Sequence, residues 1–261
     1  FDRIGAIQTR RGVTEYAPSL TERIDNFGTL RNSVIQPGYD LLETVGEEAV
    51  FSEVAEYPAG VKIDDEHILV FYTGVDNDGF AQVMETSLTT GGLVPLGTPL
   101  EFDAANGEES KCIQIDATHF LNVWVGPNLD GFAQVFTVNP VTWSVTDNGS
   151  PLEFDASEGT KFSIAQVDSN HFILFYKGVS DGHATILEIN LGTYAVTKPG
   201  ATLITITGGA DYNSVVALGD GTRFINFALD VANNDGVAQV FEVNTGTWAI
   251  TALGTPLVFT A

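Results

Sequence analysis

The chain has 261 residues, with 11 Lys and Arg against 34 Asp and Glu, so its formal net charge is −23. A surface this acidic repels nucleic-acid backbones and anionic membranes, and we expect neither as a partner. The single cysteine, Cys112, excludes an intrachain disulfide, and no apolar run approaches the roughly 18 residues that cross a membrane as a helix.

The N-terminal segment has a charge of its own. Residues 1–35 carry five arginines against four acids, whereas the other 226 residues (261 minus 35) carry 6 basic and 30 acidic side chains. A nearly neutral, Arg-bearing segment can dock onto an acidic neighbour. We therefore predict that residues 1–35 contact other protein subunits of an assembly. The arginines concerned are Arg3, Arg10, Arg11, Arg23 and Arg31.

From residue 49 onward the sequence repeats itself with a period of 52 residues. Four units cover about residues 49–101, 102–153, 154–206 and 207–261. Each unit has an Asp followed three residues later by His or Arg, then an apolar run, a turn with Asp-Gly, and a second apolar run such as "FAQVFTV". Fixed-period repetition is the signature of a repeat architecture.

Each unit is predicted to form four short antiparallel strands. Asp-Gly between two apolar runs is a strong hairpin signal. The two central runs are apolar on consecutive residues, so both faces of the sheet must be covered. Sheets of about 50 residues that cover one another are the blades of a β-propeller. We predict an all-β propeller of five blades, with residues 1–48 supplying ring-closing strands or a partial blade. The alternative is four blades with residues 1–48 as an N-terminal arm.

The Asp-x-x-His pairs resemble a metal site or a base with its orienting carboxylate. The repeat argues against both, since equivalent positions are spread around a ring and do not converge. An Asp at a hairpin turn caps backbone N–H groups, and a cation three residues later pairs with it. We therefore predict structural turn pairs. They are Asp64 and His67, Asp116 and His119, Asp168 and His171, and Asp220 and Arg223.

Two acidic turns are candidates for a cation site, "GVDNDGF" and "DVANNDG", and the first is the one that we assign. Asp76 and Asp78 flank Asn77 there, and calcium is bound by closely spaced carboxylates. The turn resembles the Asp/Asn-rich calcium loops of integrin-type propellers, although no further acid follows the glycine. Calcium is thus the only cofactor that we consider, and the alternative is an ordinary hairpin turn.

Aromatic residues recur at one position of three units, as Trp143, Tyr194 and Trp248. The blade number and repeat length resemble the sugar-binding propellers of the tachylectin type, which hold glycans in aromatic and polar pockets. These residues are predicted either to pack between blades or to form ligand-binding platforms for a glycan.

The repeat "GFAQVFTVN…TW.V…G.PLEFD" resembles those of tailed-phage appendage and virion proteins and of secreted bacterial repeat proteins. That resemblance implies a non-enzymatic structural or attachment protein in a virion or extracellular assembly. No nucleophile elbow, phosphate loop or zinc signature is present. The alternative is a secreted lectin-like or carbohydrate-active, glycosidase-type propeller.

Overall fold

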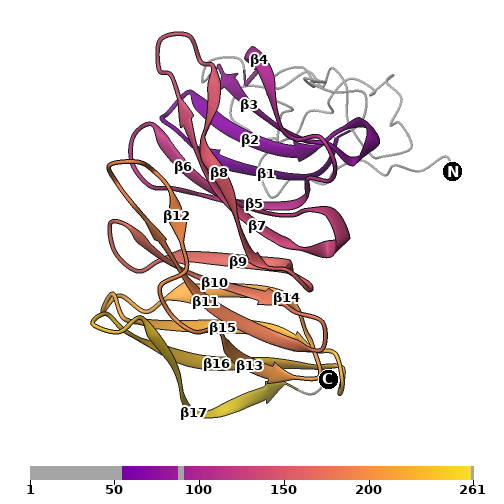
Figure 1. Ribbon diagram of the computed structural model, residues 1–261, viewed down its shortest axis with the longest axis vertical. Coiled ribbons are helices and arrows are strands. Elements are labelled where there is room, and N and C mark those ends of the chain that lie inside the picture. The colour runs from indigo at the N-terminus through magenta and orange to yellow at the C-terminus, as the bar shows by residue number, and fades with distance from the viewer. Residues whose placement is uncertain (1–54, 88–90, 260–261) are drawn as a thin grey trace, which may run out of the picture. The chain divides into compact units, whose positions relative to one another are not determined.

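The computed structural model describes residues 55–87 and 91–259, which all belong to the compact unit Glu48–Ala261. In these residues the chain forms 17 strands, and the only helical turns are the short 3-10 segments Val75–Asn77 and Pro127–Leu129. Figure 1 shows the strands gathered into successive sheets. The prediction of an all-β chain built from four-stranded antiparallel sheets is confirmed.

The described strands form four sheets in chain order. The first sheet contains β1 (Glu56–Lys62), β2 (His67–Thr73), β3 (Gly79–Thr86) and β4 (Leu93–Asp103). The second contains β5 (Glu108–Gln114), β6 (His119–Val125), β7 (Gly131–Val138) and β8 (Val145–Asp155). The third contains β9 (Thr160–Gln166), β10 (His171–Lys177), β11 (Asp181–Ile189), β12 (Val196–Thr197) and β13 (Leu203–Thr207). The fourth contains β14 (Ala210–Ala217), β15 (Arg223–Asp230), β16 (Asp235–Asn244) and β17 (Ala249–Phe259).

Each sheet is a meander in which neighbouring strands pair antiparallel; in the third sheet, β12 and β13 share the edge of β11. The first strand of each sheet lies against the first strand of the next, so β1, β5, β9 and β14 form one continuous inner row. We call these four the inner strands. This arrangement is propeller-like.

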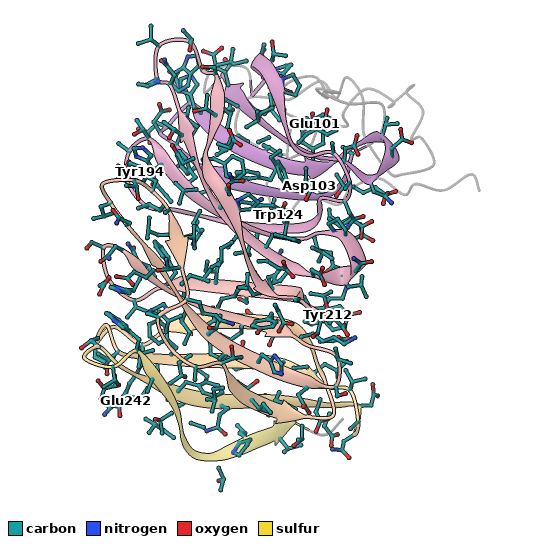
Figure 2. All side chains as sticks on the ribbon, viewed as in Figure 1. Glu101, Asp103, Trp124, Tyr194, Tyr212 and Glu242 are labelled. Atoms are coloured by element: carbon teal, nitrogen blue, oxygen red, sulfur yellow. The ribbon has the colours of Figure 1, made fainter. Side chains whose placement is uncertain are left out.

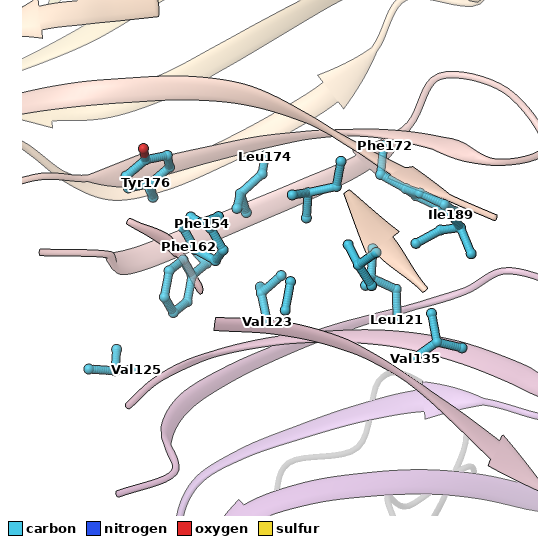
Figure 3. Packing of buried hydrophobic residues seen from close by; sticks show 13 residues of the cluster. Leu121, Val123, Val125, Val135, Phe154, Phe162, Phe172, Leu174, Tyr176 and Ile189 are labelled. Carbon is cyan, nitrogen blue, oxygen red and sulfur yellow. The ribbon is translucent and has the colours of Figure 1, made fainter. Parts of the chain in front are cut away.

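The core lies between the sheets, because the central strands are apolar on both faces. Between the second and third sheets, Leu121 and Val123 of β6 pack in one cluster with Phe172, Leu174 and Tyr176 of β10, all without solvent exposure (Figure 3). Burying one such side chain stabilises the fold by about 1.5–3 kcal/mol. Covered faces on both sides explain why consecutive apolar residues occur in these strands.

The outward face of the fourth sheet differs from the faces between sheets. Phe227 of β15 is 38% exposed, whereas Phe175, one period earlier in the repeat, and Phe71, three periods earlier, are fully buried. Its ring stacks on Phe259 of β17 at a centroid distance of 6.5 Å. The outward face of the fourth sheet thus carries the same apolar residue types as the faces that pack against a neighbouring sheet. A large part of this outward face is nevertheless exposed to solvent.

Candidate functional site

The Asp-x-x-His motifs close the turn between the first two strands of a sheet. Asp116 Oδ1 accepts hydrogen bonds from the backbone N–H groups of Thr118 (2.9 Å) and His119 (3.0 Å), and it lies 2.8 Å from His119 Nδ1. Burial raises the pKa of Asp116, but these hydrogen bonds and the neighbouring imidazole outweigh burial and hold the pKa below its usual value. The same bonds recur at Asp64 and Asp168, so the motif holds a turn in each of three sheets.

Each of these histidines also stacks on an aromatic ring of the next sheet. His67 lies on Trp143, His119 on Tyr194 and His171 on Trp248, with ring centroids 3.6, 3.6 and 3.5 Å apart. The three aromatic residues are half-buried. One face of each predicted platform is therefore occupied by an imidazole, and the stacks join consecutive sheets. We call them the inter-sheet stacks.

The backbone at the three aromatic positions adopts a conformation that is unfavourable for residues with a side chain. Trp143, Tyr194 and Trp248 have φ values of 57°, 56° and 59°, a left-handed conformation that is costly for residues with a side chain. The first sheet has Gly91 at the equivalent position, with φ 65°. The turn alone therefore suits glycine, and the aromatic ring is kept where a histidine of the preceding sheet lies beneath it.

In the turn of the fourth sheet, Arg223 stands where the other three sheets have a histidine. Asp220 Oδ1 accepts hydrogen bonds from the N–H groups of Thr222 and Arg223, at 3.0 and 2.7 Å. The Arg223 guanidinium lies 3.2 Å from Glu242 Oε1 and 3.7 Å from Asp220 Oδ2. Arg223 thus pairs with carboxylates of its own sheet, and it keeps the turn without stacking on any described aromatic ring.

The remaining predicted site residues are not brought together. Asp76 lies within the 3-10 turn Val75–Asn77, with φ 60°, and Asp78 follows that turn. Within residues 55–87 and 91–259, no group of three or more His, Cys, Asp or Glu side chains is placed to hold a metal ion. Calcium binding there stays a prediction. Arg3, Arg10, Arg11, Arg23 and Arg31 lie outside the described residues.

The inner strands carry a group of four residues that the sequence patterns do not identify. Each inner strand has a β-bulge with one residue in the left-handed conformation: Tyr57 (φ 47°), Glu109 (49°), Lys161 (54°) and Tyr212 (54°). Strained conformations of this kind cluster at functional sites. The four positions are equivalent in the repeat, yet they hold three different residue types, Tyr, Glu and Lys, unlike the residues that maintain the sheets.

These side chains surround a cavity of about 420 Å³. Tyr57 is 48% exposed and Tyr212 74% exposed, so both rings are accessible. Figure 2 places Tyr212 at the edge of the sheets opposite the one that carries Tyr194. The inner-strand cavity is therefore separate from the inter-sheet stack at Tyr194. Its lining consists of Tyr57, Pro58, Glu109, Ser110, Lys111, Lys161, Phe162, Tyr212 and Asn213.

The polar groups of the inner-strand cavity are held in place by hydrogen bonds between sheets. Glu109 Oε2 accepts a hydrogen bond from the Lys161 N–H (3.0 Å), and Glu109 Oε1 pairs with the Lys161 ammonium. Asn213 donates to the Lys161 carbonyl at 3.0 Å. The hydrogen bond and charge of Glu109 raise the pKa of Lys161, so this lysine stays charged at neutral pH. The site is therefore organised before any ligand arrives.

Further charged residues flank the cavity. Lys177 of β10 lies 3.4 Å from Glu158 Oε1 and 3.7 Å from Asp211 Oδ1. Asp211 Oδ1 is buried and accepts no hydrogen bond from the described residues. Asp211 directly precedes Tyr212, so a buried carboxylate whose Oδ1 contacts the Lys177 ammonium lies beside the inner-strand cavity.

The successive antiparallel sheets, joined along their inner strands, define a propeller-like fold. No family profile matches the chain, and no curated protein sequence matches it significantly. Among solved structures, a putative 6-phosphogluconolactonase from Bacteroides uniformis is similar at 12% identity and a TM-score of 0.58, over 77% of this chain and 54% of that one. A second putative 6-phosphogluconolactonase, from Bacteroides fragilis, is similar at 14% identity and a TM-score of 0.55, over 76% of this chain and 54% of that one.

A lectin from Aleuria aurantia, solved with Fucα1-6GlcNAc, is similar at 10% identity and a TM-score of 0.51, over 78% of this chain and 61% of the lectin. The chain spans about half the length of the two putative lactonases. At these identities the likeness concerns the fold alone. That fold is propeller-like, as the repeat style predicts.

These comparisons correct the prediction of a non-enzymatic structural or attachment protein of a virion. The similar structures are two putative lactonases and a lectin, so the fold is one that enzymes and sugar-binding proteins use. The prediction failed because the repeated residues maintain turns, sheets and stacks, and therefore say nothing about ligands. The inner-strand positions share a backbone conformation rather than a residue type, so no residue pattern in the sequence points to them.

In the part of the chain that the structure describes, no helix has the length and apolar character needed to span a membrane.

Proposed function

We propose that the protein is a carbohydrate-directed propeller that binds a sugar in the inner-strand cavity. The observation that carries this proposal is a set of four equivalent left-handed positions that hold three residue types around one cavity: Tyr57, Glu109, Lys161 and Tyr212. A scaffold keeps strained residues where their side chains are used.

The chemistry of the lining suits a sugar. The C–H groups of a pyranose ring can pack on an accessible tyrosine ring, and Tyr57 and Tyr212 offer two such rings. Sugar hydroxyls can donate to the Glu109 carboxylate and accept from the Lys161 ammonium, both charge-assisted hydrogen bonds. A concave site with accessible rings and a few fixed polar groups is typical of ligand pockets.

The test is titration of the full chain with a panel of neutral and charged glycosides. We expect binding by the wild type and a loss of at least about tenfold in affinity for Tyr57→Ala and Tyr212→Ala. Val141→Ala, an exposed apolar residue outside the cavity lining, is the control and should bind like the wild type. Binding that survives both tyrosine substitutions would overturn the proposal.

A second candidate is hydrolysis of the bound sugar or sugar lactone. The observation that favours it is Asp211, a carboxylate beside Tyr212 whose Oδ1 accepts no hydrogen bond from the described residues and lies 3.7 Å from the Lys177 ammonium. A carboxylate can take a proton from an attacking water, and Asp211 would do so once its Oδ1, buried in this structure, is opened to the cavity. Assays with aryl glycosides and sugar lactones test this candidate: turnover should disappear in Asp211→Asn while binding remains. Turnover that persists in this variant would remove Asp211 from the mechanism.

We also keep five blades as a proposal. The exposed apolar face of Phe227 and Phe259 supports a further covering sheet, and residues 1–48 are its predicted source. Deleting residues 1–48 should then lower the stability of the remainder. The docking role of the five arginines and a location outside the cell are predictions that await their own experiments.

A further inference from the structure

Three of the six basic residues beyond residue 35 lie in or beside the inner-strand cavity. Beyond residue 35 the chain has six basic residues against 30 acidic ones. Lys111 and Lys161 line the cavity, and Lys177 flanks it through Asp211. Half of these basic residues thus lie at a single place, where random placement among so many acids would scatter them.

Two of the three lysines are already neutralised. Lys161 pairs with Glu109, and Lys177 lies between Glu158 and Asp211. Lys111 is exposed, and no carboxylate among the described residues lies within ion-pair distance of its ammonium group. The cavity therefore offers one positive charge that no carboxylate of residues 55–87 and 91–259 balances.

Lys111 also departs from the repeat. Paired with Val123 in the neighbouring strand, it occupies the position that Ala59 holds in the first sheet and Ser163 in the third. In the fourth sheet that position is Ser214, which pairs with Phe227. A small residue is enough for the sheet, so the long cationic side chain is not required by the packing of the inner strand.

From these observations, and resting on the proposed sugar-binding function, we infer that the cavity selects an acidic sugar whose carboxylate pairs with Lys111. The ring of the sugar packs on Tyr57 or Tyr212, and its hydroxyls contact the Glu109–Lys161 pair. A single unbalanced ammonium matches the single charge of a carboxylate better than the charge of a phosphate, which is about −1.5 to −2 at neutral pH. A uronic acid glycoside is the simplest ligand of this kind.

The experiment compares three probes in calorimetric titrations of the full chain: methyl glucuronoside, methyl glucoside and glucose 6-phosphate. A salt concentration of about 0.15 M shortens the Debye length to about 8 Å and screens the distant acidic surface. We expect the glucuronoside to bind roughly tenfold more tightly than the glucoside. In Lys111→Gln the two should bind equally, with the affinity for the glucoside unchanged.

The matched control is Lys62→Gln, since Lys62 is an exposed lysine of an inner strand that pairs with Asp65 and does not line the cavity. It should keep the preference of the wild type. A glucuronoside preference that survives Lys111→Gln would overturn the assignment of Lys111, and tighter binding of glucose 6-phosphate would overturn the carboxylate.

The outcomes separate the two proposals. Binding of the glucoside that depends on Tyr212, without any preference for the glucuronoside, would overturn the acidic ligand and leave the sugar-binding function standing. An absence of binding by all three probes would overturn both.

Discussion

The imidazole of His119 lies flat on the ring of Tyr194, with centroids 3.6 Å apart and planes inclined by 13°. The Tyr194 hydroxyl donates to Asp116 Oδ2 at 3.4 Å, so the residue that caps the turn of the second sheet also contacts the third. A short-range motif, Asp-x-x-His, thereby takes part in a contact between distant segments.

Removal of this stack should weaken the junction between the second and third sheets. We expect His119→Ala to lower the free energy of unfolding by about 1–2 kcal/mol, from the lost ring contact and the lost partner of Asp116. Urea unfolding measures the change. Arg223→Ala is the matched control, because Arg223 has the same place in its turn and stacks on no described aromatic ring. Equal losses in both variants would contradict a role for the stack.

Close packing at Gly131 leaves no space for a side chain. A Cβ atom there would lie 2.5 Å from the Phe154 ring and 3.1 Å from the Gly159 Cα atom. We expect Gly131→Ala to destabilise the protein by about 1–3 kcal/mol, since a packed core cannot yield to an added methyl group. Gly60→Ala is the control, with nothing within 4 Å of its Cβ position. Thermal unfolding that ranks Gly60→Ala as the less stable variant would contradict this packing.

The buried Trp124 depends on Asp103 for its hydrogen bond. Its indole N–H donates to Asp103 Oδ2 at 2.9 Å, and Asp103 Oδ1 accepts from the N–H groups of Ala105 and Asn106. Asp103→Ala leaves a buried donor unpaired and should cost about 1–3 kcal/mol in urea unfolding. Glu101→Ala, an exposed carboxylate of the same strand, should change stability by less than about 0.5 kcal/mol. A similar loss in both would mean that only net charge matters.

Acid should destabilise the protein through the turn aspartates. Hydrogen bonds hold the pKa of Asp64, Asp116, Asp168 and Asp220 below the ordinary value of 3.8. A depressed pKa contributes stability that is present above the ordinary value and is lost as the pH falls through the folded-state pKa. The melting temperature should therefore fall most steeply below about pH 4.

The variant Asp116→Asn tests this assignment, because an amide keeps the acceptor oxygen but does not titrate in this range. Between pH 4 and pH 2 its melting temperature should fall less than that of the wild type. The difference should be roughly a quarter of the fall that the four turn aspartates together cause in the wild type. An unchanged acid profile would remove Asp116 from the groups responsible.

The sequence indicates the sheets and the turn pairs because both depend on local spacing. The residues Asp116 and His119 are three apart, and the chain cannot form that turn without bringing them close. The partner of His119 in the next sheet, Tyr194, is recognisable as an aromatic position, but no spacing rule links it to that histidine. Only the packing of one sheet on the next defines this contact.

The inner-strand cavity escapes prediction for two physical reasons. Its four residues share a backbone conformation rather than a residue type, and a left-handed φ at Tyr57 or Lys161 has no sequence signal. The fourth position is also displaced, because the turn between β14 and β15 is closed by Leu218 N–H to Arg223 O, one residue longer than the bond from Val167 to His171. Tyr212 therefore falls one residue short of the 52-residue period.

The repeated bulge has a consequence for how such proteins can change. Tyrosine, glutamate and lysine all occupy the same left-handed bulge on the inner strands, so the backbone there accepts side chains of opposite chemistry. The inter-sheet stacks and turn aspartates, which hold the sheets, lie in other positions of the unit. In the proposed site, the residues that contact the ligand are therefore different from those that hold the sheets together. A library that varies only the four bulge residues would change the first set and leave the second unchanged.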